Sequence, residues 1–248
     1  MYDDDRPEHA PRLVLVHGVM DRASSFGRVV GNLHDVVVVA YDRRGYAHSS
    51  GVAATGGLDE QVDDLLGILG DTPASVVGHS MGGVVALIAA ERRPDVVEAL
   101  GVYEPPMPWL DWWPQTTAGS QAAAEASDPG AAAERFLRVL VGDESWEMLP
   151  MRTQQQRRDE GAALVADLQS IRVATPPFDT RAISVPVTVA RGSATRDHHI
   201  KGAAFLADAL AVPLHTVDGA GHNAHQSHPR EFAAFCRVVL ASARESEL

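Results

Sequence analysis

The chain has 248 residues, of which 45% are hydrophobic, so it can bury a full core in one domain with an insertion. Its formal net charge of −12 argues against nucleic acid and anionic membranes as partners, because both select clustered lysine and arginine. One cysteine excludes an internal disulfide and no run reaches the roughly 18 apolar residues of a membrane span, so a cytoplasmic protein without membrane contact is expected.

The first hundred residues alternate apolar runs with segments of helical spacing. Residues 1–11 are polar and begin with acidic side chains, unlike a signal peptide. Apolar runs typical of buried strands cover 13–16, 36–41, 74–79 and about 97–103. Because segments of helical spacing separate these runs, the pattern predicts a mostly parallel sheet with helices on both faces.

The alternation breaks between residues 105 and 183. This stretch shows no clear buried strand and has two helical segments, near 130–141 and 153–173. Its length of about eighty residues is far more than a crossover between two strands needs. Residues 105–183 are therefore expected to form a helical lid, inserted between the core segments 1–104 and 184–248.

The sheet is expected to resume after the insertion. Apolar runs at 185–190 and 214–217 predict two further strands, which gives a sheet of about six. Between them, His199 is expected in the first turn of a solvent-facing helix. A closing helix over 229–243 would have Val238 among its inward side chains.

The most informative motif is Gly78-His79-Ser80-Met81-Gly82, between the third apolar run and an alanine-rich helical stretch. In such a G-x-S-x-G pattern the serine lies on a tight turn from strand to helix, where side chains at the glycines would collide with the surrounding chain. Ser80 is therefore the candidate nucleophile. The alternative is a glycine-rich turn whose serine only caps the helix, which predicts no chemical partners elsewhere.

Further chemistry-bearing residues also follow predicted strands. His17-Gly18 comes after the first strand, Glu104 after the fourth, Asp197 in the loop after the fifth, and His222 after the last. Because ligands of an open parallel sheet gather at the carboxyl ends of its strands, these residues are expected to share one site. A serine nucleophile needs a base in reach and a third group to orient that base, so this grouping favours a serine hydrolase.

Four segments follow one another along the chain: His17-Gly18-Val19-Met20, Asp42-Arg43-Arg44-Gly45-Tyr46, Gly78-His79-Ser80-Met81-Gly82-Gly83 and Gly219-Ala220-Gly221-His222. As an ordered set they are highly specific, and through them the chain resembles the α/β-hydrolase superfamily, in its lid-bearing group of serine esterases. The resemblance implies the α/β-hydrolase fold, Ser80 as nucleophile, His222 as general base and acid, and no cofactor. It also implies an oxyanion hole made by the backbone N–H groups of Val19 and Met81. The antiparallel hairpin that usually opens this fold is not expected here, because residues 1–11 cannot supply it.

The acid of the catalytic triad is open to two interpretations. The superfamily usually has an aspartate three residues after the glycine that ends the fifth strand, where this chain has Thr195. Asp197, two residues later, could serve if the loop bulges. Glu104 is the other candidate, because some members of the superfamily supply their acid from the end of the fourth strand. We favour Glu104, since the two prolines that follow it would stiffen the chain there.

The expected reaction is the hydrolysis of a carboxylic ester or lactone with a sizeable apolar part, through an acyl-enzyme. Trp109, Trp112 and Trp113 are the candidate residues of the substrate pocket. No metal is expected, and the only partner required is a small-molecule substrate. The enzyme would be a monomer or a homodimer. The alternatives are other chemistry on this scaffold (C–C bond or amide hydrolysis, acyl transfer, perhydrolysis) or ligand binding without turnover.

Overall fold

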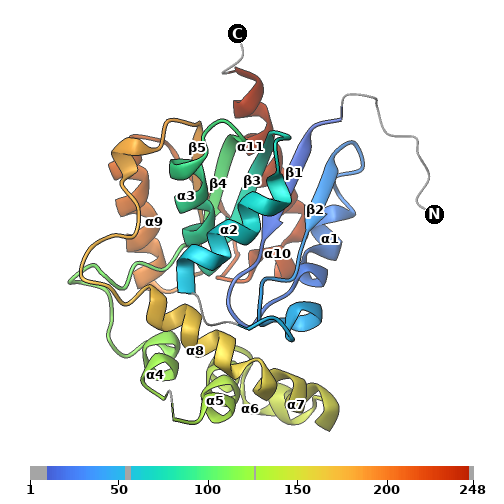
Figure 1. Ribbon diagram of the computed structural model, residues 1–248, viewed down its shortest axis with the longest axis vertical. Coiled ribbons are helices and arrows are strands. Elements are labelled where there is room, and N and C mark those ends of the chain that lie inside the picture. Colours follow the sequence, from blue (N-terminus) through green and yellow to red (C-terminus); the bar gives the residue numbers. More distant parts are fainter. Residues whose placement is uncertain (1–9, 54–56, 126, 246–248) are drawn as a thin grey trace.

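The computed structural model describes residues 10–53, 57–125 and 127–245 (Figure 1). These residues contain a six-stranded sheet in the order β2-β1-β3-β4-β5-β6, and each neighbouring pair of strands is parallel. The predicted fold, a parallel sheet of about six strands with helices on both faces, is thus confirmed. The predicted lack of a hairpin concerns residues 1–11, most of which lie outside the described residues.

The strands follow the predicted apolar runs closely. In chain order they are β1 (Arg12–Val16), β2 (Val37–Ala40), β3 (Ala74–His79), β4 (Val97–Tyr103), β5 (Val187–Gly192) and β6 (Leu214–Val217). The prediction that residues 36–41 form a buried strand is wrong, because β2 lies at an edge of the sheet and its side chains are only half-buried. A strand with one neighbour is covered less completely than a central one such as β3, which is buried throughout.

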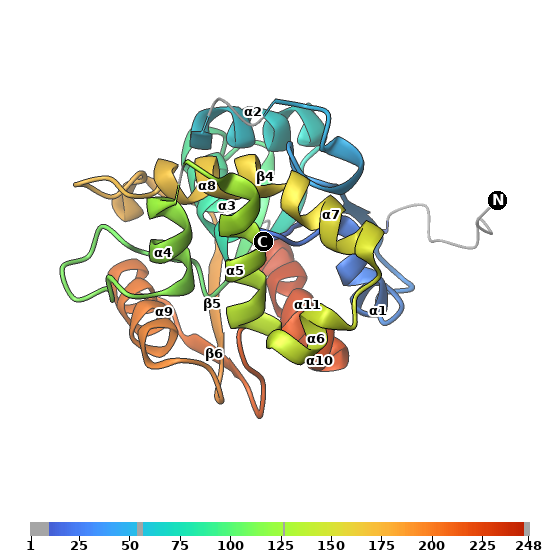
Figure 2. The same ribbon diagram turned by 90° about the horizontal axis from the view of Figure 1, so that it is seen from below.

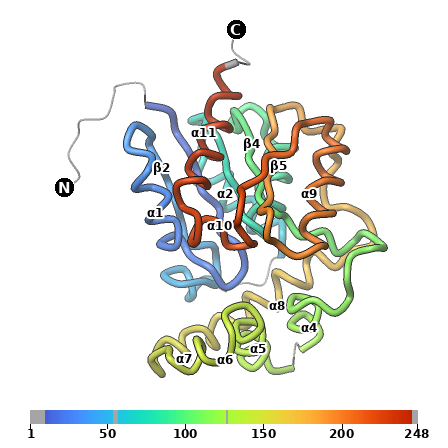
Figure 3. Tube along the Cα trace, turned by 180° about the vertical axis from the view of Figure 1, so that it is seen from behind, coloured from blue at the N-terminus to red at the C-terminus, as the bar shows by residue number. Residues whose placement is uncertain are grey.

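Helices cover both faces of the sheet. On one face lie α2 (Gly57–Leu69), α3 (Met81–Arg92) and α9 (Asp197–Leu210), and Figure 3 shows α1 (Gly27–Val30) and α11 (Pro229–Glu245) on the other. The segment predicted as a helix over 23–33 is shorter, a 3₁₀ turn followed by the single turn of α1.

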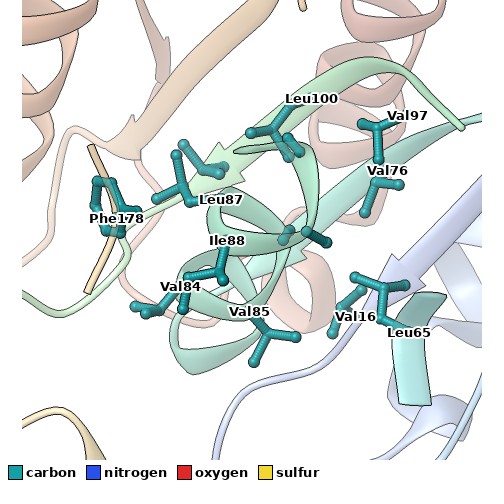
Figure 4. Close-up of a cluster of buried hydrophobic side chains, with 14 of the residues drawn as sticks. Val16, Leu65, Val76, Val84, Val85, Leu87, Ile88, Val97, Leu100 and Phe178 are labelled. Carbon is teal, nitrogen blue, oxygen red and sulfur yellow. The ribbon is translucent and has the colours of Figure 1, made fainter. Parts of the chain in front are cut away.

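The core between α3 and the sheet consists of aliphatic side chains. Figure 4 shows Val84, Leu87 and Ile88 of α3 in the same cluster as Val76 and Leu100 of the sheet. Aliphatic burial of this kind is the main source of stability for such a domain.

The prediction that Val238 points inward is wrong. Its side chain is 43% exposed, whereas Phe232, Phe235 and Val239 of the same helix are buried. At 3.6 residues per turn, positions 232, 235 and 239 fall on one side of α11 and position 238 falls outside that stripe.

The insertion between β4 and β5 is helical, as predicted. Its helices are α4 (Ala118–Ala124), α5 (Pro129–Val141), α6 (Asp143–Glu147), α7 (Met151–Asp159) and α8 (Gly161–Ser170). They form a layer beside the main sheet domain (Figures 1 and 2), and α4, α5, α6 and α8 share a hydrophobic cluster with Met20 and Tyr46 of the core. Within the described residues, no helix combines the length and apolarity needed to cross a bilayer.

Buried polar contacts fix α8 to the core. Asp167 of α8 accepts hydrogen bonds from Arg43 Nη2 and the Tyr46 hydroxyl, both at 2.8 Å, and from Gln61 Nε2 at 3.2 Å. Arg43 also donates to the backbone oxygen of His17 at 2.9 Å. Because Arg43 and Asp167 are both buried, the pair depends on these additional hydrogen bonds to offset the loss of hydration.

Candidate active site

Ser80 lies on a strained turn between β3 and α3. Its backbone has φ 53° and ψ −122°, and its N–H donates to the Tyr103 oxygen at 2.9 Å. A positive φ is costly for a residue with a Cβ, so the surrounding chain must hold it. The neighbouring glycines permit this, because a Cβ at Gly78 would lie 2.3 Å from the Gly82 oxygen and one at Gly82 would lie 2.2 Å from the Val16 oxygen.

His222 and Glu104 meet at the carboxyl edge of the sheet. Nδ1 of His222 lies 2.7 Å from Oε2 of Glu104, whose side chain is fully buried directly after β4. The same carboxylate accepts hydrogen bonds from the Gly192 N–H at 2.8 Å and from the Thr195 hydroxyl at 2.9 Å. A carboxylate held in this way keeps the imidazole proton on Nδ1 and leaves Nε2 free to accept another.

Asp197, the alternative acid, occupies a different place. It is exposed in the first turn of α9, where a negative charge suits the helix N-terminus. Among the hydrogen bonds of the described residues, the carboxylate that contacts the His222 ring is that of Glu104. Thr195, which stands where the superfamily usually has its aspartate, helps to hold Glu104 in position.

Ser80 and His222 line one cavity of about 460 Å³, together with Val19 and Met81. Within the described part of the chain, no hydrogen bond joins the Ser80 hydroxyl to the His222 ring. Such contacts often tighten only when substrate is bound. Much of the apolar wall comes from the insertion, through Phe136, Leu137, Leu140, Val141, Leu168 and Ile171.

The three tryptophans differ in their positions. Trp113 lines the cavity. The expectation that Trp109 and Trp112 line it does not hold: Trp109 packs edge-on against Phe178, with ring centroids 5.8 Å apart, and Trp112 is 41% exposed beside Phe205. Their aromatic character alone could not show which of them faces inward.

Two histidines that the sequence analysis did not assign to the site lie against His222. His199 stacks on the His222 ring, so the prediction that it faces solvent is wrong: α9 begins at the carboxyl end of β5 and its first turn faces the site. The His79 ring also packs against the His222 ring, with centroids 4.8 Å apart, and His79 Nε2 donates a hydrogen bond to the His222 backbone oxygen at 2.9 Å. Burial lowers the pKa of His79 well below its usual value, so this ring stays neutral.

Among the described residues, histidine and carboxylate side chains converge in two places, and in each the candidate ligand atoms lie within 4.8 Å of one another. The groups are Asp21, His79 and His225, and Glu104, His199 and His222. In both, a ring nitrogen already shares a hydrogen bond with the carboxylate, at 2.9 Å for His225 and Asp21 and at 2.7 Å for His222 and Glu104. Burial acts to raise the pKa of Asp21, but His225 outweighs it and holds the pKa below its usual range. The donor sets therefore fit paired hydrogen bonds better than vacant metal sites.

Comparisons with curated proteins point to one family. A model of the alpha/beta hydrolase family matches residues 13–235. The lipase LipV of Mycobacterium tuberculosis is 36% identical over 102 residues, which cover 40% of this chain and 39% of the lipase. The 2-succinyl-6-hydroxy-2,4-cyclohexadiene-1-carboxylate synthase of Enterobacter sp. (strain 638) is 28% identical over 253 residues, which cover 93% of this chain and 92% of the synthase. The chain thus spans less than half of the lipase's length and nearly all of the synthase's.

Solved structures agree on the fold. MenH from S. aureus superposes with a TM-score of 0.74 at 19% identity and covers 96% of each chain. A carboxylesterase of the thaumarchaeon Nitrososphaera gargenis has a TM-score of 0.72 at 19% identity, over 99% of this chain and 95% of its own. At such identities the likeness concerns the fold alone. With the family model matched over residues 13–235, the chain belongs to the alpha/beta hydrolase family.

Proposed function

We propose that the protein is a serine hydrolase that cleaves a carboxylic ester or lactone with an apolar part. The observation that carries the proposal is the 2.7 Å contact between His222 Nδ1 and Glu104, at a cavity that also holds Ser80 on its strained turn. Nucleophile, base and orienting acid are the three groups that acyl transfer to a serine requires.

In the acylation step, Ser80 Oγ attacks the substrate carbonyl while His222 Nε2 takes its proton. Glu104 stabilises the imidazolium that forms and holds the ring in place. The oxyanion is bound by the backbone N–H groups of Val19 and Met81, each of which contributes roughly 3–4 kcal/mol to the transition state. His222 then passes its proton to the leaving alcohol oxygen.

In the deacylation step, a water molecule attacks the carbonyl carbon of the acyl group that is bound to Ser80 Oγ. His222 takes the proton of this water and returns it to Ser80 Oγ, which releases the acid and restores the enzyme. With a lactone, the leaving alcohol stays attached to the acyl group and departs with it.

The cavity supports an apolar substrate of moderate size. Its volume of about 460 Å³ lies within the range of small-molecule pockets. Phe136 and Leu137 of α5 and Leu168 of α8 line it, so the insertion would bury the apolar part of the substrate. Such burial contributes roughly 25 cal/mol for each Å² removed from water.

A fluorophosphonate tests the proposal directly. The expected result is a single covalent adduct, seen by intact mass and mapped to Ser80 by peptide analysis, with none in Ser80→Ala. A folded wild-type protein that takes up no label and hydrolyses no p-nitrophenyl ester would contradict the proposal and favour ligand binding without turnover.

The activity of the synthase relatives is a second candidate. The extent of the sequence match favours it, because the match to the Enterobacter synthase extends over 93% of this chain and the match to the lipase over only 40%. The test is the formation of 2-succinyl-6-hydroxy-2,4-cyclohexadiene-1-carboxylate from its precursor, with Ser80→Ala as control. Formation of this product without ester hydrolysis would favour the synthase activity.

A further inference from the structure

His199 lies face to face with the candidate catalytic base. The rings of His199 and His222 are 4.2 Å apart between centroids, at an angle of only 14°. The His199 side chain is 12% exposed, and Trp113 packs edge-on against it, with ring centroids 5.9 Å apart. One face of the His222 ring is therefore covered by His199, which Trp113 backs, and all three side chains line the cavity.

The contact between the two residues is made by ring faces rather than by a hydrogen bond. Nδ1 of His199 is 3.9 Å from Oε2 of Glu104, which is too far for a hydrogen bond, and this buried nitrogen has no hydrogen-bond partner among the described residues. His199 thus leaves all three hydrogen bonds of the Glu104 carboxylate to Gly192, Thr195 and His222.

His199 is neutral at physiological pH. Burial lowers its pKa well below the usual value, and the neighbouring His222 and His198 act in the same direction. Its place in the first turn of α9 adds to this, because a helix N-terminus disfavours positive charge. A neutral ring can remain stacked on His222 when that ring takes up a proton, whereas a charged one would repel it.

The His222 ring depends on its surroundings for its orientation. His222 lies in the loop after β6. The His79 ring packs against the His222 ring at a tilt of 47°, and His79 Nε2 donates a hydrogen bond to the backbone oxygen of His222. Glu104 fixes the Nδ1 edge at one point only, about which the ring can still turn. The stacked face of His199 opposes that rotation.

We propose that His199 is a positioning residue: its ring face holds the His222 imidazole in the plane that keeps Nδ1 on Glu104 and Nε2 toward Ser80, and shields this pair from water. The kinetic consequence rests on the proposed serine hydrolase function. The positional claim does not, because it concerns the His222–Glu104 contact itself.

Three variants separate this role from a general loss of structure. His199→Ala removes the ring, His199→Phe keeps an aromatic face without nitrogen atoms, and His34→Ala removes an exposed histidine away from the site. With p-nitrophenyl butyrate, kcat of His199→Ala should fall between about 10- and 100-fold with little change in KM, as expected for a misplaced catalytic group. His199→Phe should retain most of the wild-type kcat, and His34→Ala all of it.

Proton NMR provides a readout that does not depend on turnover. The proton between His222 Nδ1 and Glu104 should give a low-field resonance, assigned by its loss in Glu104→Gln. It should persist in His199→Phe and disappear in His199→Ala through exchange with water. The proposal is overturned if this resonance survives in His199→Ala, if kcat of that variant stays within about twofold of wild type, or if His199→Phe is equally impaired. Wild-type protein without ester hydrolysis or labelling would instead refute the hydrolase function, and the resonance would still decide the role of His199.

Discussion

Replacing Glu104 by glutamine exchanges one carboxylate oxygen for an amide group and keeps the size of the side chain. The carboxylate accepts hydrogen bonds from Gly192, Thr195 and His222, so the amide nitrogen must oppose a donor in either orientation. If it faces His222, the ring has to turn Nδ1 into an acceptor and carry its proton on Nε2. In that tautomer His222 cannot take the proton of Ser80.

We expect kcat of Glu104→Gln to fall by between about 10³- and 10⁴-fold, which corresponds to roughly 4–5 kcal/mol of transition-state stabilisation. The alternative orientation, with the amide against the Gly192 N–H, preserves the tautomer but leaves a buried donor unpaired. That costs about 1–3 kcal/mol of folding free energy, so the first orientation, with the changed His222 tautomer, is the expected one.

The assay is hydrolysis of p-nitrophenyl butyrate by protein whose folded fraction is checked by circular dichroism. Asp197→Asn is the matched control, because Asp197 is exposed in the first turn of α9. It should keep kcat near the wild-type value. The reasoning is refuted if Glu104→Gln stays within about tenfold of wild type, or if Asp197→Asn loses as much activity.

Three further predictions concern stability. Gly82→Ala should yield no folded protein, because its Cβ would lie 2.2 Å from a strand carbonyl oxygen, and soluble, folded Gly82→Ala would contradict this prediction. The control, Gly67→Ala, has open space for its Cβ and should stabilise α2 by about 0.5–1 kcal/mol. Asp167→Asn leaves the buried Arg43 without its counter-charge and should cost about 3–5 kcal/mol in urea denaturation; a loss under about 1 kcal/mol would refute the argument. Burial lowers the pKa of His17 from 6.5 to about 3, so between these pH values the unfolded chain binds a proton that the folded chain does not. The free energy of unfolding should therefore decrease as pH falls from 6.5 toward 3, and a constant or rising value over that interval would contradict the prediction.

The sheet was predictable because its strands are continuous apolar runs. The run at 214–217 matches β6 residue for residue. What local pattern could not supply is the order of strands, which decides that Val37–Ala40 is an edge strand. The same limit applies to His199, since spacing along α9 does not show which side of its first turn meets the site.

The site was predictable in outline, because its candidate residues follow strand ends. Which carboxylate would meet His222 depended on a contact between residues 118 positions apart, beyond any local pattern. The catalytic roles of these residues, the cytoplasmic location and the monomeric or homodimeric state stay predictions.

The buried contacts of Asp167 have a consequence for rebuilding this protein. Arg43 belongs to the core, but its counter-charge is supplied by α8 of the insertion. A chimera that exchanged the whole insertion for one from another hydrolase would leave a guanidinium buried without a partner, at a cost of several kcal/mol. The feasible junctions therefore lie before α8, so that α4 to α7 can be exchanged while α8 is inherited with the core.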